Sequence, residues 1–553
     1  MGNNRSKTNS FVIQGSILAF AGIMVRVIGL LYRIPLNRIL GAQGLGYYTT
    51  AFEVYNILIL LSSQSMPLAV SKIVSEKLER RQYRNAHKVF KGAMIYALLL
   101  GGVLGLVAFI GADWIAVTFY KLPQIAVALR ILAPTLTVSC VLGVLRGYFQ
   151  GMGNMAPTAI SQLVEQIINA FVSVIAAYEL GSFGYTLSKI ESKSKVYQDT
   201  YAAAGGTLGT LAGAIAALVI LVLVLYNSRN VLSAKRRRDR SRVESSYQTI
   251  MKVIFFTITP VLISTTIYNI GNLLDNPIYQ NIMNGVFKLG EKTRSARWGI
   301  YSGYYKLLTT MPIAIASALS TAIVPSLVRS YISGDRDVVR TKVGLALKFS
   351  MIIAFPCGVG LSVLGGPINE LLFRSKEAAS TTGIMAFSVF TVVFFSLSTI
   401  SNAILQGIDK LQIPIINSAM SLAIHLIVLP VLLIVFHMDI YAVVVGDFLF
   451  AGTMVIFNAK SIKKFLGYRQ DWIETFAKPF VCSAVMGIGC YIVYIAIRAL
   501  TRMPSIATLF AIIVSIVIYG VMLVVSKTIT EDELESMPKG EVLIGLFKKV
   551  HLL

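Results

Sequence analysis

The feature that most constrains this chain is a succession of apolar segments, each about as long as a helix needs to cross a bilayer. At roughly 20 residues per span, the 553-residue sequence predicts fourteen helices. Only 14% of the residues are charged, and the mean hydropathy is +0.71. A soluble enzyme would have roughly a quarter of its residues charged, so the sequence predicts an all-α polytopic membrane protein. The predicted spans are 11–31, 46–71, 89–111, 125–147, 157–179, 202–226, 250–274, 298–328, 343–366, 380–406, 412–436, 440–459, 474–498 and 504–526.

The formal net charge of +24 is unevenly distributed over the predicted loops. With the N-terminus in the cytoplasm, the most basic stretches, 72–91 and 227–242, both fall on the cytoplasmic side. Basic loops stay inside and are attracted to anionic lipids. We therefore expect a multi-pass membrane protein with both termini cytoplasmic and with membrane lipids, not nucleic acid, as its anionic partners.

Two weak internal matches suggest a parallel repeat. Residues 54–110 align with the second half at an offset of about 254, and Gln150-Gly151 corresponds to Gln406-Gly407, each with a proline six or seven residues beyond the glycine. Repeats of this kind are common in transporters. The predicted organisation is an N-terminal six-helix lobe (1–226), a basic cytoplasmic linker (227–248), a C-terminal six-helix lobe (249–466), helices 13 and 14 (467–526) and an amphipathic cytoplasmic tail (527–553).

Arg26 and Arg33 are the charges in the first helix that most suggest a site. They are seven residues apart and so share a helix face. An arginine inside a membrane is costly unless it faces a bundle interior or water, and guanidinium groups bind phosphate bidentately. The alternative is that both side chains extend to the membrane interface. The first interpretation predicts a hydrated, basic cavity that binds phosphate.

Glu53 and Lys306 are the other interior charges of the predicted cavity helices, and their positions nearly correspond in the repeat. They form either a structural ion pair or a gate that opens as phosphate competes for Lys306. Asn269, Asn272 and Asp275 form a polar stripe at the predicted end of helix 7 and are candidates to line the same cavity. Three tyrosines of helix 8 either join them or form an interfacial belt: Tyr301, Tyr304 and Tyr305.

No motif indicates an enzyme or a cofactor. The four cysteines lie in apolar segments and are expected to be core residues, and the four histidines form no metal-ligand pair. Asp335-Arg336-Asp337 matches the D-x-D pattern of glycosyltransferases, but it lies in a short loop and is expected to be solvated. A polyprenyl glycosyltransferase should also have a large extramembrane domain, and no predicted loop is long enough for one.

Several motifs in order along the chain resemble one superfamily. They are Arg26-Val27-Ile28-Gly29, the run G-A-x-G-x-G-x-Y over 41–48, the paired Q-G motifs and the closing M-P-K-G…K-K segment. Together they resemble the multidrug/oligosaccharidyl-lipid/polysaccharide exporters, and within these the MurJ branch of Gram-positive bacteria and its stage V sporulation protein B relatives.

The resemblance implies a lipid II flippase, which moves the undecaprenyl-diphosphate-linked peptidoglycan precursor to the outer leaflet by alternating access. It implies a cationic cavity lined by helices 1, 2, 7 and 8, with Arg26 and Arg33 as phosphate ligands, and a groove for the lipid tail on helices 13 and 14. Partners would be the lipid-linked substrate and other cell-wall synthesis proteins. Alternatives are a flippase for another polyprenyl-linked polysaccharide or sporulation precursor, or a multidrug antiporter, which Arg26 argues against. Helix 11 offers Asn417 and Ser421 but no acid where some relatives bind sodium, so ion coupling stays open.

Overall fold

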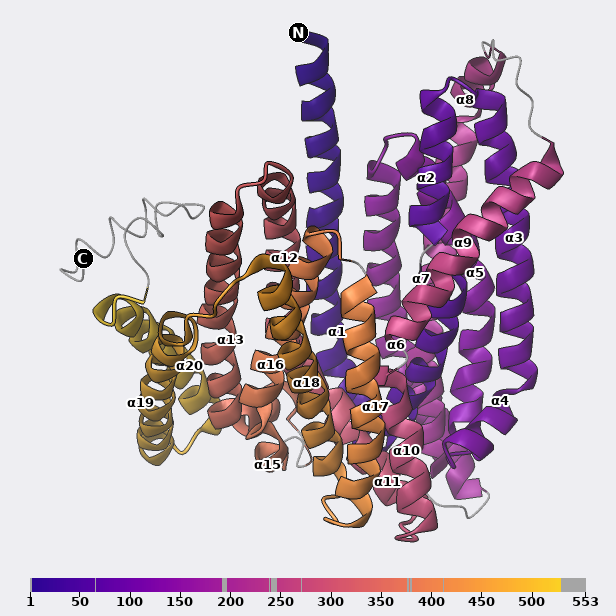
Figure 1. The fold of residues 1–553 in the computed structure, drawn as a ribbon. Helices are drawn as coiled ribbons and strands as arrows, with labels where there is room; N and C mark the ends of the chain where they lie inside the picture. Colours follow the sequence, from indigo (N-terminus) through magenta and orange to yellow (C-terminus); the bar gives the residue numbers. More distant parts are fainter. Residues whose placement is uncertain are drawn as a thin grey trace. The chain divides into compact units, whose positions relative to one another are not determined.

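A computed structural model describes residues 2–64, 66–190, 196–237, 239, 246–269, 271–374, 377, 380–410 and 412–528, with side chains except at 2–16, 19, 235, 257, 260–273 and 317–326. Helices and turns, without a strand, make up these described ranges (Figure 1). The amphipathic tail predicted at 527–553 lies almost wholly outside them, whereas the linker predicted at 227–248 is described except at 238 and 240–245.

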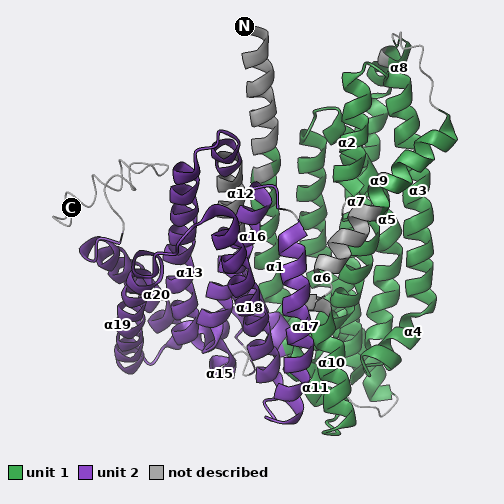
Figure 2. Cartoon of the chain, viewed as in Figure 1, with its two compact units in different colours: residues 1–299 green, residues 300–553 purple. Residues whose placement is uncertain are grey.

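Packing divides the chain into two compact units, which Figure 2 colours separately. Unit 1 is residues 1–299 and unit 2 is residues 300–553. This division reports which helices pack together, and it places the helices of 247–299 with the N-terminal ones. The boundary of the sequence repeat, between 226 and 249, comes from sequence matches and not from packing, and it stays a prediction.

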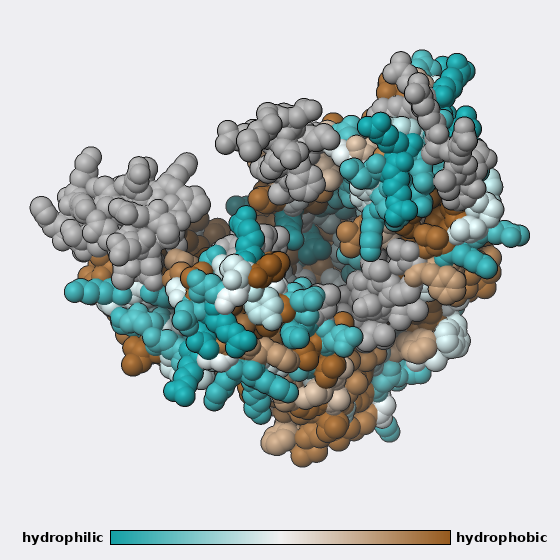
Figure 3. Space-filling view, turned by 45° about the horizontal axis from the view of Figure 1, so that its top comes forward, coloured by the Kyte–Doolittle hydropathy of each residue, from teal (hydrophilic) through white to brown (hydrophobic). Residues whose placement is uncertain are grey.

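Unit 1 is a bundle around a core formed mainly by α2, α3, α5, α7 and α9. On the face drawn in Figure 3, hydrophilic residues gather at the helix ends near α2 and α8, and hydrophobic residues cover the flanks below them. Its elements are α1 (Gly2–Ser62), α2 (Met66–Glu79), α3 (Tyr83–Ile110), α4 (Ala112–Trp114), the π-helical turn η1 (Ile115–Phe119), α5 (Ile125–Gly151), α6 (Ala156–Ile190), α7 (Val196–Asn227), α8 (Arg229–Arg237), α9 (Tyr247–Asn269), α10 (Gly271–Gly285) and α11 (Glu291–Gly299).

The first two predicted spans are joined in α1, which passes through Pro35 and bends at Gly41. Gly41 has φ 61° and ψ −178°, a conformation open only to glycine. The predicted spans end at 31 and begin again at 46, whereas α1 includes the residues between them. That boundary is wrong, because a backbone in lipid must satisfy its own hydrogen bonds, and continuing the helix does so.

Helices α6 and α7 form a close pair and extend well beyond their predicted spans. Gly205 and Gly209 of α7 lie against the backbones of Ala176 and Ser173 of α6, so that a Cβ on either glycine would overlap its neighbour. Small residues allow helix axes to approach closely in membranes, where packing rather than hydrophobicity drives association. Because the two helices pack this closely, both stay helical through the polar residues at 180–190 and 196–201.

Unit 2 is built around α13, which packs against α12, α16, α19 and α20. The two C-terminal helices therefore attach to the unit through α13. Its elements are the π-helical turn η2 (Ile300–Tyr305), α12 (Lys306–Ile332), α13 (Arg336–Phe373), α15 (Thr382–Met385), α16 (Ser388–Gly407), α17 (Gln412–Ile434), α18 (Ile440–Leu466), the π-helical turn η3 (Ile473–Ala477), α19 (Lys478–Thr501) and α20 (Pro504–Val525).

Among the described residues, 11 helices are long and apolar enough to cross a membrane. One of them, Phe20–Glu79, bends at Gly41 and so provides two of the predicted spans. The helical segments at 247–285 and 291–332 correspond to the two remaining predictions. The predicted all-α, polytopic fold is therefore confirmed.

Candidate functional site

Arg26 and Arg33 lie on one face of α1, because the helix is unbroken between them. Both side chains are exposed. The Arg33 guanidinium lies near two buried tyrosines, Tyr32 and Tyr48. At Gly29, a Cβ would lie 3.1 Å from Nε2 of Gln166. Gly29 lies between the two arginines on this same face, so the face that carries the exposed arginines also approaches α6 at Gln166.

Glu53 is the centre of a buried polar cluster within unit 1. Its carboxylate accepts hydrogen bonds from Asn276 Nδ2 at 2.5 Å and from Trp298 Nε1 at 3.1 Å. Asn276 also donates to Thr50 Oγ1 at 2.9 Å and accepts from Gln280 Nε2 at 3.2 Å. The cluster joins α1, α10 and α11, and its amide members are less than 2% exposed. Glu53 is therefore held by fixed donors inside its own unit.

The G-A-x-G-x-G-x-Y segment explains why α11 can approach α1. A Cβ at Gly46 would overlap the carbonyl of Ser295, and one at Gly299 would overlap the carbonyl of Ala42. Ser295 Oγ also donates to the backbone oxygen of Gln43 at 2.9 Å. The glycines bring the two backbones together, and polar contacts then fix their register.

Arg294 is a buried charge that sequence reasoning missed. It is 3% exposed and donates to three backbone carbonyls, those of Leu289, Gln280 and Lys121, at 3.0, 3.1 and 3.2 Å. The highly charged stretch around it was expected to be a loop before helix 8. Its hydrogen-bonding pattern indicates a structural role, because it ties two connecting segments to α11.

In unit 2, Lys306 is connected to Asp447 through Tyr301. The Lys306 ammonium lies 3.3 Å from the Tyr301 hydroxyl, which donates to Asp447 Oδ2. His425 Nδ1 lies 3.0 Å from the carbonyl oxygen of Gly446, next to Asp447 in the chain. Tyr301 sits on η2, and π-helical turns often occur at functional sites.

The three helix 8 tyrosines are core residues, so the interfacial-belt interpretation is wrong. Tyr301, Tyr304 and Tyr305 are at most 1% exposed. The Tyr305 hydroxyl lies 2.7 Å from Thr391 Oγ1, and the Tyr304 ring packs on Phe373 with centroids 4.8 Å apart. Their position after α11 places them inside the bundle rather than at a helix end.

The polar stripe predicted on helix 7 is only partly described. Asp275 is buried, at 2% exposed, whereas the side chains of Asn269 and Asn272 lie outside those that the structure describes. The helix was predicted to end near Asp275, but α10 continues to Gly285. That boundary is wrong. The residues after Asp275 stay helical because the side-chain amides of Asn276 and Gln280 are buried in the Glu53 cluster.

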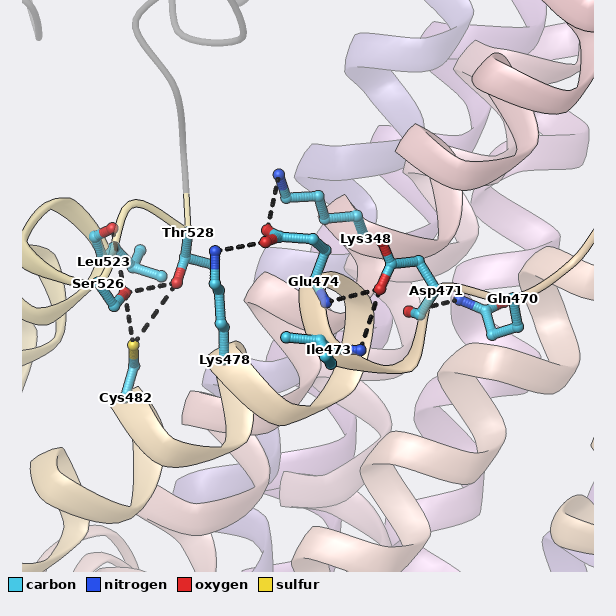
Figure 4. A network of polar contacts seen from close by, with 10 residues as sticks. All are labelled: Lys348, Gln470, Asp471, Ile473, Glu474, Lys478, Cys482, Leu523, Ser526 and Thr528. Atoms are coloured by element: carbon cyan, nitrogen blue, oxygen red, sulfur yellow. Dashed lines mark hydrogen bonds and ion pairs between the residues drawn. The ribbon is translucent and has the colours of Figure 1, made fainter.

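Four titratable residues inside the two units each have a polar partner: Glu165, Lys348, His425 and Asp447. Two of them form ion pairs with a partner on another helix: Glu165 with Arg146 at 2.5 Å, and Lys348 with Glu474 at 3.9 Å. The other two are the His425 and Asp447 described above. Figure 4 shows Lys348 and Glu474, with Lys478 donating to the same carboxylate.

The D-x-D segment and the cysteines also have defined places in the structure. Asp335 caps α13 by accepting the Val338 N–H at 3.1 Å, and Asp337 pairs with Arg340 at 3.0 Å, so the D-x-D segment is an exposed helix start. Three of the four cysteines belong to hydrophobic clusters, as expected for core residues: Cys140, Cys482 and Cys490. The described residues contain no group of acidic, histidine or cysteine side chains that could hold a metal ion.

Known proteins resemble this chain over most of its length. It is 24% identical to the lipid II flippase MurJ of Bacillus subtilis over 500 residues, which cover 88% of this chain and 89% of that protein. It is 25% identical to stage V sporulation protein B of the same organism over 534 residues, which cover 94% and 96%.

Solved structures share the fold at low sequence identity. A multidrug resistance MATE family transporter of the MOP superfamily in an inward-facing conformation matches with a TM-score of 0.66 and 15% identity, over 83% of this chain and 98% of that one. Lipid II flippase MurJ in an inward closed conformation matches with a TM-score of 0.63 and 16% identity, over 91% and 97%. The fold is thus that of polytopic transporters. A family described as polysaccharide biosynthesis protein matches residues 12–331, which is more than half of the chain, and the chain therefore belongs to that family.

Proposed function

We propose that this protein is a flippase that moves lipid II, the undecaprenyl-diphosphate-linked precursor of peptidoglycan, from the inner to the outer leaflet of a bacterial plasma membrane. Support comes from the family, from the relatives named above and from the transporter fold. The proposed role includes cell wall biogenesis and cell shape, with the lipid-linked precursor and other cell-wall synthesis proteins as partners.

The observation that carries the proposal is the accessible pair Arg26 and Arg33 on one face of a membrane helix. Among the described side chains, none forms a hydrogen bond or ion pair with Arg26. A guanidinium kept inside an apolar segment without a protein counter-charge has a large electrostatic cost unless an anion or water offsets it. A diphosphate supplies two anionic groups that such a pair can bind bidentately.

We propose Lys306 as a further cation that binds the same substrate. Glu53 and Asp275 are proposed as gating or cavity residues. Within their own units, Glu53 is hydrogen-bonded to Asn276 and Trp298, and Lys306 to Tyr301. A gate formed by Glu53 and Lys306 stays a prediction. Asn269 and Asn272 are proposed as substrate-binding residues from their place in the sequence alone.

The test is complementation in a strain whose own lipid II flippase can be depleted, with lipid II on the outer leaflet as the readout. Wild-type chain is expected to restore exposure of lipid II, and Arg26→Ala to abolish it, with Arg33→Ala weaker. Arg38→Ala is the matched control, since Arg38 is also exposed on α1 but lies about a third of a turn away from Arg26. Full rescue by Arg26→Ala at wild-type expression would contradict the site.

A second cargo class follows from the match to stage V sporulation protein B, which covers more of both chains than the match to MurJ. If the wild-type chain reaches the membrane but lipid II stays inside, the proposed cargo is wrong. Another polyprenyl-diphosphate saccharide would then be the candidate, because the cationic pair selects the diphosphate and not the sugar.

A further inference from the structure

A separate cavity of about 410 Å³ opens in unit 2, and all of its lining residues belong to that unit. Its volume falls in the range of small-molecule sites, about 300–1,000 Å³. It lies where α13 and α16 meet the end of α18 and the segment 467–476 that follows.

The cavity has an apolar interior and a cationic rim. Leu347, Leu397, Val455, Ile462 and Phe476 supply the aliphatic and aromatic walls. The rim carries three exposed cations and no carboxylate among the lining residues: Lys460, Lys463 and Arg469. This combination suits a ligand with an anionic end and an apolar end.

The acids near the rim are already engaged elsewhere, as Figure 4 shows. Asp471 Oδ1 accepts the backbone N–H groups of Ile473 at 3.0 Å and Glu474 at 3.1 Å, and so caps the helix that begins there. The Glu474 carboxylate pairs with Lys348 and Lys478. Among the described residues, neither carboxylate forms an ion pair with any of the three rim cations.

The position of the cavity along the helices corresponds to the membrane surface. It lies between the end of one candidate span at Leu466 and the start of the next at Ile473. Trp472 is 69% exposed beside it and packs on Phe476 with ring centroids 5.0 Å apart. Tryptophan is enriched at the level of lipid headgroups, so the mouth of the cavity faces headgroups and its interior faces the acyl region.

The segment that forms the mouth is held in place by the neighbouring helix. Arg340 of α13 donates from Nε to the carbonyl of Leu466 at 2.9 Å. A Cβ at Gly344 would lie 3.3 Å from the Tyr468 hydroxyl, so this ring packs directly on α13. The cavity is thus preformed, which lowers the entropic cost of binding.

We propose that this cavity binds an anionic glycerophospholipid of the surrounding leaflet, with its phosphate on Lys460, Lys463 and Arg469 and part of an acyl chain between the apolar walls. Basic pockets between membrane helices recognise anionic headgroups in this way. The site is independent of the cargo, and it gives the protein a dependence on the charge of its membrane that the proposed function does not include.

The test measures lipid retained by the full-length protein, purified in neutral detergent and mixed with phosphatidylglycerol or phosphatidylcholine, by native mass spectrometry. Wild type is expected to retain one phosphatidylglycerol in preference to phosphatidylcholine. The triple variant Lys460→Gln/Lys463→Gln/Arg469→Gln is expected to lose about a hundredfold in apparent affinity. Equal retention by wild type and this variant would overturn the proposal.

The matched control removes the same charge from the same end of unit 2 without touching the cavity lining. It is Arg336→Gln/Lys410→Gln/Lys464→Gln, in which Lys410 and Lys464 lie over the Phe465 ring at 5.3 and 5.8 Å. It is expected to bind like wild type, and an equal loss in the control would overturn a specific site in favour of general attraction.

The apolar half of the site is tested separately. Ala459→Trp fills the exposed side of the cavity and is expected to block phosphatidylglycerol while all three cations remain. Glycerol phosphate, which has no acyl chain, is expected not to compete with the lipid. Undiminished binding by Ala459→Trp, or effective competition by glycerol phosphate, would overturn the proposed acyl contact.

Discussion

Glu53 is a single residue on which two helices depend for hydrogen bonding. Replacing it with alanine removes the acceptor of the Trp298 indole N–H. It also removes one of the two acceptors that the described residues offer the Asn276 amide, which keeps only Thr50. A buried donor left unsatisfied costs about 1–3 kcal/mol. Glu53→Ala should therefore lower the melting temperature in detergent, followed through intrinsic tryptophan fluorescence.

Glu53→Gln is the control for that prediction, because it keeps an acceptor oxygen while removing the charge. It should melt between wild type and Glu53→Ala. A glutamine variant as unstable as the alanine variant would mean that the negative charge, and not the acceptor, stabilises the cluster.

At the residue scale, sequence reasoning identified the charges but not their partners. Arg26, Glu53 and Lys306 stand out because each interrupts an apolar segment. Asn276 becomes the partner of Glu53, and Asp447 the relayed partner of Lys306, only through the fold, across more than 140 residues of chain. Such pairing depends on which helix faces come together, and a single sequence does not specify that.

Close helix packing makes a prediction for the pair α6 and α7. A side chain at Gly209 would overlap Ser173 and lie 2.6 Å from the backbone oxygen of Asn169. Overpacking a close contact costs about 1–3 kcal/mol or more. Gly209→Leu should lower the yield of folded protein and its melting temperature, measured after extraction from membranes.

The same substitution at Gly102 of α3 is its control, because a Cβ there has nothing within 4 Å. Gly102→Leu should leave yield and melting temperature close to those of wild type. If both leucine variants fold equally well, the separation of α6 and α7 is not fixed by their small residues.

The attachment of the C-terminal helices makes a second prediction at this scale. The Lys348 side chain is 10% exposed and pairs with Glu474, which is 37% exposed, at 3.9 Å. Glu474→Gln removes the charge that compensates the buried ammonium. Because the carboxylate is partly solvated, the loss should be about 1–2 kcal/mol rather than that of a fully buried pair.

A double-mutant cycle isolates this pair. Lys348→Met alone leaves Glu474 with Lys478, so it should cost less than Glu474→Gln, and the double variant should recover part of the loss. Strictly additive losses in thermal unfolding would show that the ion pair does not join α13 to η3.

The number and type of elements were predictable because a bilayer imposes a minimum apolar length on every span. Their ends were not. The helix runs through Pro35, continues from Asp275 to Gly285, and extends along α6 to Ile190. At each place polar or helix-breaking residues suggested a loop, but tertiary packing or the need to satisfy backbone groups kept the helix going.

At the scale of the whole molecule, the distribution of charge predicts how the chain lies in the membrane. The predicted loops that contain Arg81 and Ser333 lie on the side of the membrane with the more basic loops. The predicted loops that contain Pro123 and His437 lie on the other side. The positive-inside rule assigns the first set to the cytoplasm. A parallel repeat requires that corresponding loops in the two halves lie on the same side.

Single-cysteine labelling tests this orientation directly, because the four native cysteines are buried or half-buried and give little background. Cysteine is introduced at Arg81 and Pro123 in one half and at Ser333 and His437 in the other. A membrane-impermeant maleimide added to intact cells should label Pro123→Cys and His437→Cys, and should label Arg81→Cys and Ser333→Cys only after permeabilisation. Labelling of Arg81→Cys and Ser333→Cys from opposite sides would contradict the parallel repeat, while complete reversal would contradict the orientation and place the arginine pair of α1 in the opposite leaflet.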